Sequence, residues 1–524
     1  MCDIVNMFMA AQPGPNFITQ GVQVQSDLNI PAWNNYANIV NELDSTLIKQ
    51  LQFGFCMGVQ RDRFISVPPT NHASARVEYS AIDQFIIKHW ENKAILGPFR
   101  VNPLPVPVFP SPLQVVVTET KKRPVVDMSF PNGTSVNDAI PCEWTEIPGF
   151  SGVFSLPTHD DVCNKILSTP DPLMFVVDLA AYYLQLPIDP CDFPYMAISW
   201  RDNLYFYARL PFGCRSACLH AQRVSDAVVK IHTTLTRAKM DAYVDDFMAI
   251  LTRLLAMGNY EKFRLLLKFL GLIATLEKCK IPASFQLYLG LQYDLVNLTL
   301  ALPQEKVEKA LNMISEWLIK ETCSKSDLQS LLGNLNHFSS VVHAGRPFCA
   351  AIMDALRQDQ FPAILTDDFK FDLRMWGEFL GEGQVKSIMK SASMSAPDSI
   401  LTIAVSGRCC VVKDRDQIHG FRLHISQPDL PSPAMYILAT CCATQYCMPS
   451  MENKLVLVNV PRKYAANAIN RANVHSPEIR PLMRHSWLKQ AKNDCVIKAA
   501  YNPDINKTSL FALVKSFMDV DLTV

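Results

Sequence analysis

The chain has 524 residues, of which 49% are apolar, and its 49 basic and 49 acidic residues give a formal net charge of zero. This length exceeds what one hydrophobic core organises, so we expect two to four domains, and the apolar content excludes a chain that is disordered throughout. The sequence shows neither a secretory signal nor a charge-free run long enough to span a bilayer. We therefore expect an intracellular protein, cytoplasmic or nuclear or both, with no membrane partner and with its sixteen cysteines reduced.

The first third of the chain moves from a polar arm to extended chain. Residues 1–45 carry little pattern and are expected to be loosely ordered, whereas 74–95 place apolar residues at helical spacing and predict an amphipathic helix. The proline-rich stretch that follows predicts extended chain or edge strand, because proline fixes φ and lacks an amide donor. Residues 113–130, "LQVVVTETKKRPVVDMSF", predict two strands joined by a basic turn.

The middle of the chain alternates strands and helices. Residues 174–188 predict a strand that enters a turn or short helix, and 201–213 predict a turn followed by an aromatic strand. Residues 215–238 form a helix candidate without glycine or proline. "AYVDDFMAI", residues 242–250, predicts strand, turn and strand, and is followed by an amphipathic helix.

The last part begins with helices. Residues 303–345 predict two of them, with Pro303 at the start of the first and Ser324 capping the second. Residues 399–515 return to short strands and helices. Between Lys454 and Lys515 there are eleven Lys or Arg and three acidic residues, a net charge of +8. This stretch is either a solvated basic surface or a surface that faces phosphates.

Three aspartates stand out because they lie in or at the end of apolar runs. Asp178 ends "FVVD", and Asp245 and Asp246 interrupt "AYVDDFMAI". If the two strands are neighbours, their carboxylates meet, and such a pair suits two divalent metal ions of the kind that assist phosphoryl transfer. Each aspartate taken alone is more simply a turn residue or a helix cap.

The order of the motifs resembles the reverse transcriptase domain, and in particular that of DIRS-like retrotransposons. "SPLQVVV…KKRPVVDMSFPNGTSVNDAIP" resembles the fingers segment, "VVDLAAYYLQLPI" motif A, "LPFGCRSAC" motif B and "YVDD" motif C. "GLIATLEKCKI" resembles motif D, "LYLGLQYD" motif E, and "LQSLLGNLNHFSSVVHAGRPF" the thumb. The resemblance extends over roughly residues 50–395.

The resemblance implies a role for individual residues. Asp178, Asp245 and the backbone carbonyl of Leu179 would bind two Mg²⁺ ions, or Mn²⁺ in their place, with Asp246 as the third catalytic carboxylate. The residues that would line the nucleotide site are Lys121, Arg123, Tyr183, Phe212, Gly213 and Lys278. Lys and Arg suit triphosphate oxygens. Tyr183 and Phe212 are equally compatible with core aromatics, and Lys278 with a surface lysine.

Three positions depart from the family pattern. Cys218 stands where motif B usually has proline, Tyr182 where motif A usually has alanine, and Gln114 where a glycine is usual. Each could crowd or distort the nucleotide site, although none removes a metal ligand.

Residues 399–515 resemble a ribonuclease H domain that has lost its carboxylates. The expected acidic positions hold Ile403, Tyr436 and Val460 or Pro461, and Tyr501 stands for a histidine. A two-metal nuclease cannot hold its ions without carboxylates, so we predict that ribonuclease H activity is absent.

The sequence as a whole therefore predicts an α/β right-hand polymerase. The expected divisions are an N-terminal arm and helix (1–95), fingers and palm (96–300), a helical thumb (301–345), a connection (346–398) and an inactive ribonuclease H-like domain (399–524). The implied function is RNA-directed DNA polymerisation for a retrotransposon, with an RNA template, a DNA primer and dNTPs as partners. A recombinase or integrase of the same element would act from a separate chain. The alternatives are a catalytically decayed or host-adopted nucleic-acid-binding remnant and a structural subunit of a larger polymerase complex.

Overall fold

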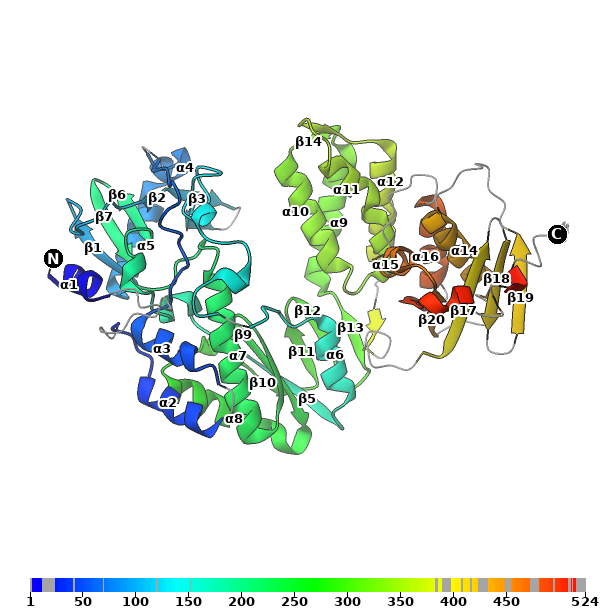
Figure 1. Cartoon of the computed structure of the whole chain (residues 1–524), viewed down its shortest axis with the longest axis horizontal. Helices are drawn as coiled ribbons and strands as arrows, with labels where there is room; N and C mark the ends of the chain where they lie inside the picture. The colour runs from blue at the N-terminus through cyan, green and yellow to red at the C-terminus, as the bar shows by residue number, and fades with distance from the viewer. Residues whose placement is uncertain are drawn as a thin grey trace. The chain divides into compact units, whose positions relative to one another are not determined.

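The computed structural model (Figure 1) divides into two compact units, Met1–Thr158 with Ser168–Gln286, and His159–Leu167 with Leu287–Val524. We describe each unit by itself. The residues described are 2–11, 24–40, 43–68, 70–118, 121–150, 152–381, 385–388, 397–406, 409–414, 417–422, 432–447, 454–471, 480–492, 495–507, 510 and 512–514.

Three helices precede the first sheet: α1 (Cys2–Ala10), α2 (Ile30–Ile39) and α3 (Ser45–Phe53). The expectation of a loosely ordered arm is wrong for α2, which packs against α8 (Arg253–Leu270). The fully buried Trp33 donates its indole N–H to the carbonyl of Leu270 at 3.1 Å, and Asn29 caps α2 through the amide of Ala32. One buried tryptophan and a capped helix start are enough to dock a segment whose remaining residues are polar.

The next helix and the proline-rich stretch build a four-stranded sheet. The amphipathic helix predicted for 74–95 is present as α4 (Ala73–Val77) and α5 (Tyr79–Glu91). The sheet has the order β1 (Ile95–Phe99), β7 (Asn203–Tyr207), β6 (Ala197–Trp200) and β2 (Pro110–Ser111). The proline-rich region is thus extended chain that contributes the two edge strands β1 and β2, as expected for residues that lack a donor.

The predicted strand pair with a basic turn is also present. β3 (Leu113–Val117) and β4 (Lys122–Val126) form an antiparallel hairpin in which Val117 pairs with Lys122. Its β4 strand begins with the basic residues of the turn.

A second four-stranded sheet has the order β10 (Lys280–Ala283), β5 (Pro172–Asp178), β9 (Asp246–Thr252) and β8 (Lys239–Tyr243). α7 (Ala217–Thr236) and α8 pack against its strands, and the core is filled by large buried side chains such as Phe175, Phe247 and Phe263. Short 3₁₀ turns lie between the elements of this unit: η1 (Asn137–Ala139), η2 (Trp144–Glu146), η3 (Tyr182–Gln185), η4 (Pro190–Asp192) and η5 (Leu276–Lys278).

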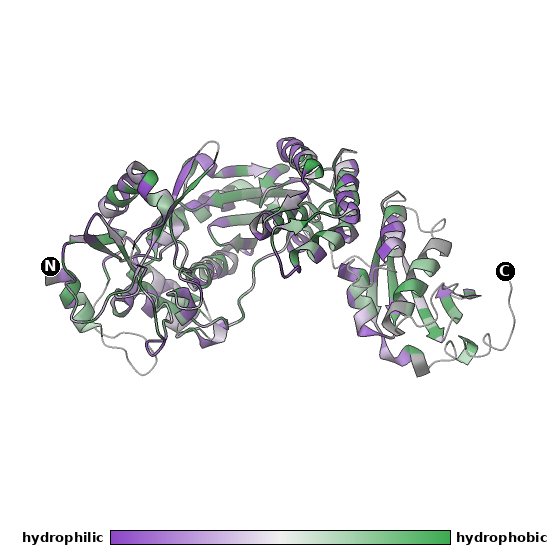
Figure 2. Ribbon diagram, turned by 90° about the horizontal axis from the view of Figure 1, so that it is seen from above, coloured by the Kyte–Doolittle hydropathy of each residue, from purple (hydrophilic) through white to green (hydrophobic). Residues whose placement is uncertain are grey.

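The second unit begins with α6 (His159–Leu167) and continues with a sheet in the order β11 (Phe285–Tyr288), β12 (Leu291–Asp294), β13 (Thr299–Ala301) and β16 (Val385–Ser387). Its helices are α9 (Gln304–Ile319), α10 (Lys325–Phe338), α11 (Ala350–Leu356) and α12 (Asp367–Gly381), with η6 (His343–Cys349) and the short pair β14 (Thr322–Cys323) and β15 (Ala363–Ile364). Both predicted helix starts are confirmed, since Pro303 precedes α9 and Ser324 forms a capping box with Asp327. Figure 2 shows helix ribbons that alternate between hydrophobic and hydrophilic segments, as amphipathic helices do.

The described residues in the C-terminal part of this unit include a five-stranded sheet and the helices α14 (Ser432–Cys447), α15 (Lys463–Arg471) and α16 (Arg480–Lys492). The order is β19 (Gln417–Arg422), β18 (Cys409–Asp414), β17 (Ser399–Ser406), β20 (Leu455–Val460) and β21 (Val496–Tyr501). β17, β18 and β19 are antiparallel, whereas β20 and β21 run parallel to β17. A 3₁₀ turn, η8 (Pro503–Lys507), follows β21.

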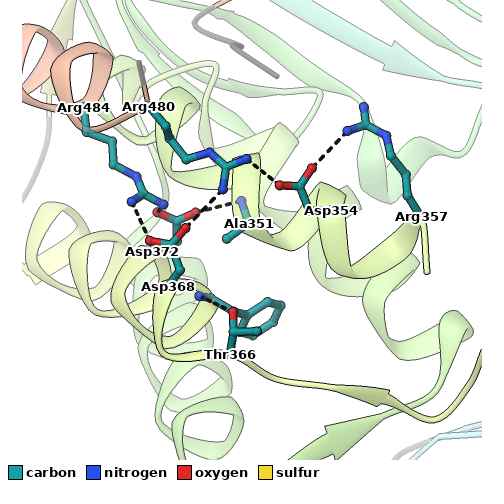
Figure 3. Close-up of polar contacts among 9 residues, drawn as sticks. Ala351, Asp354, Arg357, Thr366, Asp368, Asp372, Arg480 and Arg484 are labelled. Atoms are coloured by element: carbon teal, nitrogen blue, oxygen red, sulfur yellow. Dashed lines mark hydrogen bonds and ion pairs between the residues drawn. The ribbon is translucent and has the colours of Figure 1, made fainter. Parts of the chain in front are cut away.

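Two of the eleven basic residues of the C-terminal stretch are buried in an ion-pair cluster (Figure 3). Arg480 and Arg484 of α16 contact three aspartates, Asp354, Asp368 and Asp372, which lie on α11 and α12. The Nη1 atoms of the two arginines lie 3.1 and 2.8 Å from the Asp368 carboxylate. These arginines hold α16 against α11 and α12, so they are not available to phosphates, and the basic stretch is only in part a solvated surface.

Among the residues that the structure describes, no helix is both long enough and apolar enough to cross a membrane. None of the cysteine side chains that the structure describes forms a disulfide.

Candidate active site

The three aspartates come together at one end of the β10-β5-β9-β8 sheet. Asp178, the last residue of β5, lies directly opposite Asp246, the first residue of β9, and Asp245 occupies the turn before β9. The amide of Leu179 donates to the carbonyl of Asp245 at 3.0 Å. The Asp178–Asp246 pair is therefore a non-hydrogen-bonded pair, the kind in which opposite side chains approach most closely. The strand partner of Asp178 is thus Asp246, whereas Asp245, which the sequence pairs with Asp178, lies in the adjoining turn.

The carboxylates strongly influence one another. Burial, and then the charges of Asp178 and Asp245, raise the pKa of Asp246 to about 6. Burial and the charge of Asp178 also raise the pKa of Asp245. This concentration of negative charge favours a nearby cation.

Lys278 supplies such a cation. Its Nζ lies 3.0 and 3.1 Å from the two carboxylate oxygens of Asp178, and the pairing raises the pKa of Lys278. The lysine side chain is mostly exposed, whereas Asp178 is buried. Of the residues that sequence reasoning offered as nucleotide ligands, Lys278 is the one in direct contact with the carboxylates.

The segment that carries Lys278 is held beside β5 by the backbone. The amide of Thr275 donates to the carbonyl of Asp178 at 2.8 Å, and the amide of Ala180 donates to Ile273 at 2.9 Å. The Gln185 side chain accepts from the Ile273 amide at 2.8 Å and donates back to its carbonyl at 2.9 Å. The sequence did not single out Gln185, although a polar residue within an apolar run was a visible signal.

The turn that carries Asp245 is strained and braced. Val244 has a φ of +55°, a left-handed value that a β-branched residue rarely adopts. Its amide donates to Gln222 Oε1 at 2.8 Å, and its carbonyl accepts from Ser225 Oγ at 2.5 Å. The Gln222 amide group also donates to the carbonyl of Ala242 at 2.9 Å. Two residues of α7 thus hold the turn, and neither was predicted, because their partners are backbone atoms twenty residues away.

Tyr182 does not crowd the carboxylates. Its side chain is buried in the core, where its hydroxyl donates to the Ala221 carbonyl of α7 at 3.0 Å and lies 2.9 Å from Ser225 Oγ. The departure from alanine therefore adds a contact between η3, α7 and the strained turn.

Tyr183, Phe212 and Cys218 form a small cluster. The rings of Tyr183 and Phe212 meet edge to face with centroids 4.8 Å apart and an interplanar angle of 86°. Burial, followed by the neighbouring Cys218, raises the pKa of Tyr183, and the charge of Asp245 contributes as well. Phe212 is about half exposed, so this cluster presents an aromatic surface close to the turn rather than a sealed core.

The backbone conformation and the close packing at position 213 both require a glycine. Its φ is +98°, and a Cβ there would lie 2.7 Å from the carbonyl oxygen of Val126 at the end of β4. Asn137, which is buried, donates to the Gly213 carbonyl at 2.8 Å and accepts from the Arg215 amide at 2.8 Å. Asn137 thus ties the loop after β4 to the loop before α7, a link that the sequence alone could not reveal.

Lys121 and Arg123 lie on the β3–β4 hairpin, with exposed side chains. Between them, Lys122 pairs with Glu78 of the preceding helix at 2.6 Å. Among the described contacts, none joins Lys121 or Arg123 to the aspartates, so the structure leaves these two residues on a separate element of the same unit.

The donor set fits a hard divalent cation in chemistry and charge. Carboxylate oxygens are the ligands that Mg²⁺ prefers. Burial first, and then the neighbouring carboxylate charges, raise the pKa values of Asp245 and Asp246. No three His, Cys, Asp or Glu side chains within the described ranges already stand in a metal-binding arrangement.

Solved structures with a similar fold include foamy viral protease-reverse transcriptase in complex with an RNA/DNA hybrid. That alignment has a TM-score of 0.51 at 14% sequence identity and covers 97% of this chain and 66% of that chain. Two structures of foamy viral protease-reverse transcriptase with double-stranded DNA align at 15% identity, with TM-scores of 0.49 and 0.47. They cover 93% and 92% of this chain and 85% and 98% of their own, and are too distant to carry an argument. No family model and no curated protein matches the sequence. The chain has an α/β, reverse transcriptase-like fold.

Proposed function

We propose that this chain is an RNA-directed DNA polymerase of a DIRS-like retrotransposon, which extends a DNA primer on an RNA template with dNTPs. The observation that carries the proposal is the meeting of Asp178 and Asp246 across β5 and β9, with Asp245 in the adjoining turn. A reverse transcriptase-like fold supports it, and so does the RNA/DNA hybrid in the complex of the foamy viral protein.

In this proposal Asp178, Asp245 and the Leu179 carbonyl would hold two Mg²⁺ ions, or Mn²⁺, with Asp246 beside them. The bound ions would supply charge neutralisation for the attack of the primer 3′-hydroxyl on the α-phosphate and for the departure of pyrophosphate. Lys278, which pairs with Asp178 in this structure, would donate a proton or a charge to the leaving group. Lys121 and Arg123 bind triphosphate oxygens, and Tyr183, Phe212 and Gly213 line the sugar and base.

We further propose that residues 399–524 are a ribonuclease H-like domain without nuclease activity. A sheet of three antiparallel strands followed by two parallel strands supports the assignment. Ile403, Tyr436 and Val460, at the expected carboxylate positions, belong to one buried apolar cluster. None of these three side chains carries a carboxylate that could bind a metal ion.

Primer extension on poly(rA)/oligo(dT) tests the polymerase proposal. The full chain should incorporate dTTP with Mg²⁺ or Mn²⁺, and Asp178→Asn and Asp245→Asn should each abolish incorporation. The control variant Asp202→Asn should retain incorporation. Asp202 lies in the exposed turn between β6 and β7, where its φ is already +60°. Folded protein that incorporates nothing with either metal would overturn the proposal.

The replacement of the expected C-terminal carboxylates by a packed apolar cluster favours a second candidate, a catalytically decayed or host-adopted protein that binds nucleic acid. It predicts that the chain binds an RNA/DNA hybrid but incorporates no nucleotide, and the same assay combined with a hybrid-binding measurement separates the two functions.

A further inference from the structure

The outward face of α8 is unusually apolar for a solvated helix. Leu254 is 92% exposed and Leu265 is 64% exposed, and Phe269 and Met257 are each about half exposed. The opposite face packs into the core through Phe263 and its neighbours, so the exposed stripe is additional to the face that the fold needs. An outward helix face normally carries charged and polar residues, and large exposed apolar patches mark interaction sites.

Part of this stripe forms one wall of a groove. The groove encloses about 780 Å³ and is bounded by α2, the C-terminal end of α7 and α8, all of the first unit. Leu235, Leu265 and Phe269 are among its apolar lining residues, and the ring of Phe269 meets that of Tyr36 edge to face with centroids 6.2 Å apart. It is a concave, mostly apolar channel between helices, the geometry in which amphipathic helices bind.

The charges around the groove select its occupant. Lys262 and Lys268 line it, and none of its lining residues is acidic. A partner with carboxylates beside its apolar anchors would pair with both lysines. A second copy of this chain would bring the same lysines towards each other, and a flat bilayer could not fill a concave groove. Nucleic acid would leave the apolar walls uncovered.

We propose that the groove between α2, α7 and α8 docks an acidic amphipathic helix of a partner protein. The helix places apolar residues, spaced at i, i+3 or i+4 and i+7, against Leu235, Leu265 and Phe269, and its carboxylates meet Lys262 and Lys268. None of the residues assigned to polymerisation lines the groove, so peptide binding can be tested independently of polymerase activity.

Fluorescence anisotropy with three labelled peptides tests the proposal on the full chain. The first is a designed helix with leucine at those spacings and glutamate on its flanks, and the second replaces each glutamate with lysine. The third is a synthetic peptide of residues 515–524, "KSFMDVDLTV", which also combines apolar and acidic residues. The glutamate helix should bind and the lysine helix should not. Tighter binding of the third peptide would assign the groove to the chain's own C-terminal segment instead and overturn the proposal.

Variants establish where the peptide binds. Leu265→Asp should weaken the glutamate helix at least about tenfold, because it removes an apolar anchor and adds a repelling charge. Leu254→Asp, on the same helix but outside the groove, should leave affinity unchanged. The double variant Lys262→Glu with Lys268→Glu should reverse the preference in favour of the lysine helix. All of these side chains are exposed, and an unchanged melting temperature confirms that each variant is folded.

Three further results would overturn the proposal. One is that neither helix binds, or that both bind equally and independently of Leu265. Another is a concentration-dependent dimer, seen by sedimentation, that Leu265→Asp abolishes, which would give the groove to a second copy. The third is binding to anionic vesicles that is lost in the same variant, which would give it to a membrane surface.

Discussion

Gln222 is one of two α7 side chains that hold the strained turn carrying Asp245, and replacing it should disturb both stability and activity. Gln222→Met keeps the length of the side chain but cannot hydrogen-bond. It removes the acceptor for the Val244 amide at 2.8 Å and the donor to the Ala242 carbonyl at 2.9 Å, both buried. In this variant, the described side-chain hydrogen bond that still holds Val244 at its positive φ is the one from Ser225.

The magnitude follows from these bonds. A buried backbone group left without its partner costs about 1–3 kcal/mol, so two such groups cost about 2–6 kcal/mol. Part of this is recovered if the turn relaxes, since a strained backbone conformation stores about 1–3 kcal/mol. We expect a net loss of about 3 kcal/mol in the free energy of unfolding. In a unit of this size that lowers the melting temperature by about 6–12 °C.

The relaxed turn also displaces Asp245. A shift of about 1 Å in a catalytic group costs about a hundredfold in rate, so primer extension should fall by about that factor. Thermal and urea unfolding measure the first effect, and single-nucleotide incorporation at saturating dTTP measures the second. Adding Val244→Gly to Gln222→Met should restore part of the lost stability, because glycine accepts the positive φ without strain.

Gln304→Met, an exposed glutamine on α9, is the matched control and should change neither quantity. If Gln222→Met stays within about 0.5 kcal/mol of the wild type, the range of an ordinary surface substitution, Gln222 does not brace the turn. If stability falls but incorporation is unchanged, the turn does not position a catalytic group.

Three further predictions concern other parts of the chain. Burial raises the pKa of Asp192 to about 7, so its contribution to stability is present below its unfolded pKa of about 4 and is lost as the pH rises through 7. The difference in free energy of unfolding between Asp192→Asn and the wild type should therefore shift in favour of the variant when the pH is raised from 5 to 8. Urea titrations measure this difference, and a difference that is the same at both pH values would contradict the prediction. Arg484→Met leaves the fully buried Asp372 without its cation and should lower the free energy of unfolding, measured by calorimetry, by about 3–5 kcal/mol. Adding Asp372→Leu should recover most of this loss. A loss below about 1 kcal/mol in Arg484→Met would refute the role of the cluster. Gly213→Ala should lower both the stability of the protein and primer extension. Gly133 has a similar φ, but a Cβ there would meet no atom within 4 Å, so Gly133→Ala should lose only the stability that backbone strain removes. Equal losses in the two variants would show that the close contact at Gly213 is unimportant.

Much of the local structure followed from the sequence because it depends on local physics. The hairpin around Asp245, the helix over 217–236 and the cap at Ser324 are set by hydrophobic period, turn residues and capping. The polar N-terminal arm was misjudged, because the docking of α2 depends on Trp33 reaching Leu270, a contact across more than two hundred residues. No pattern within the arm reports that partner.

The sequence by itself determined which residues carry the candidate chemistry: three aspartates in or at the end of apolar runs and a lysine in the motif D segment. Only the tertiary structure decided that Asp178 faces Asp246, that Lys278 pairs with Asp178, and that Gln222 holds the turn. The side-chain types are written in the chain, whereas their mutual distances arise from strand pairing and from the packing of α7 on the sheet. Sequence spacing does not encode such long-range contacts, because they form only when the sheet assembles.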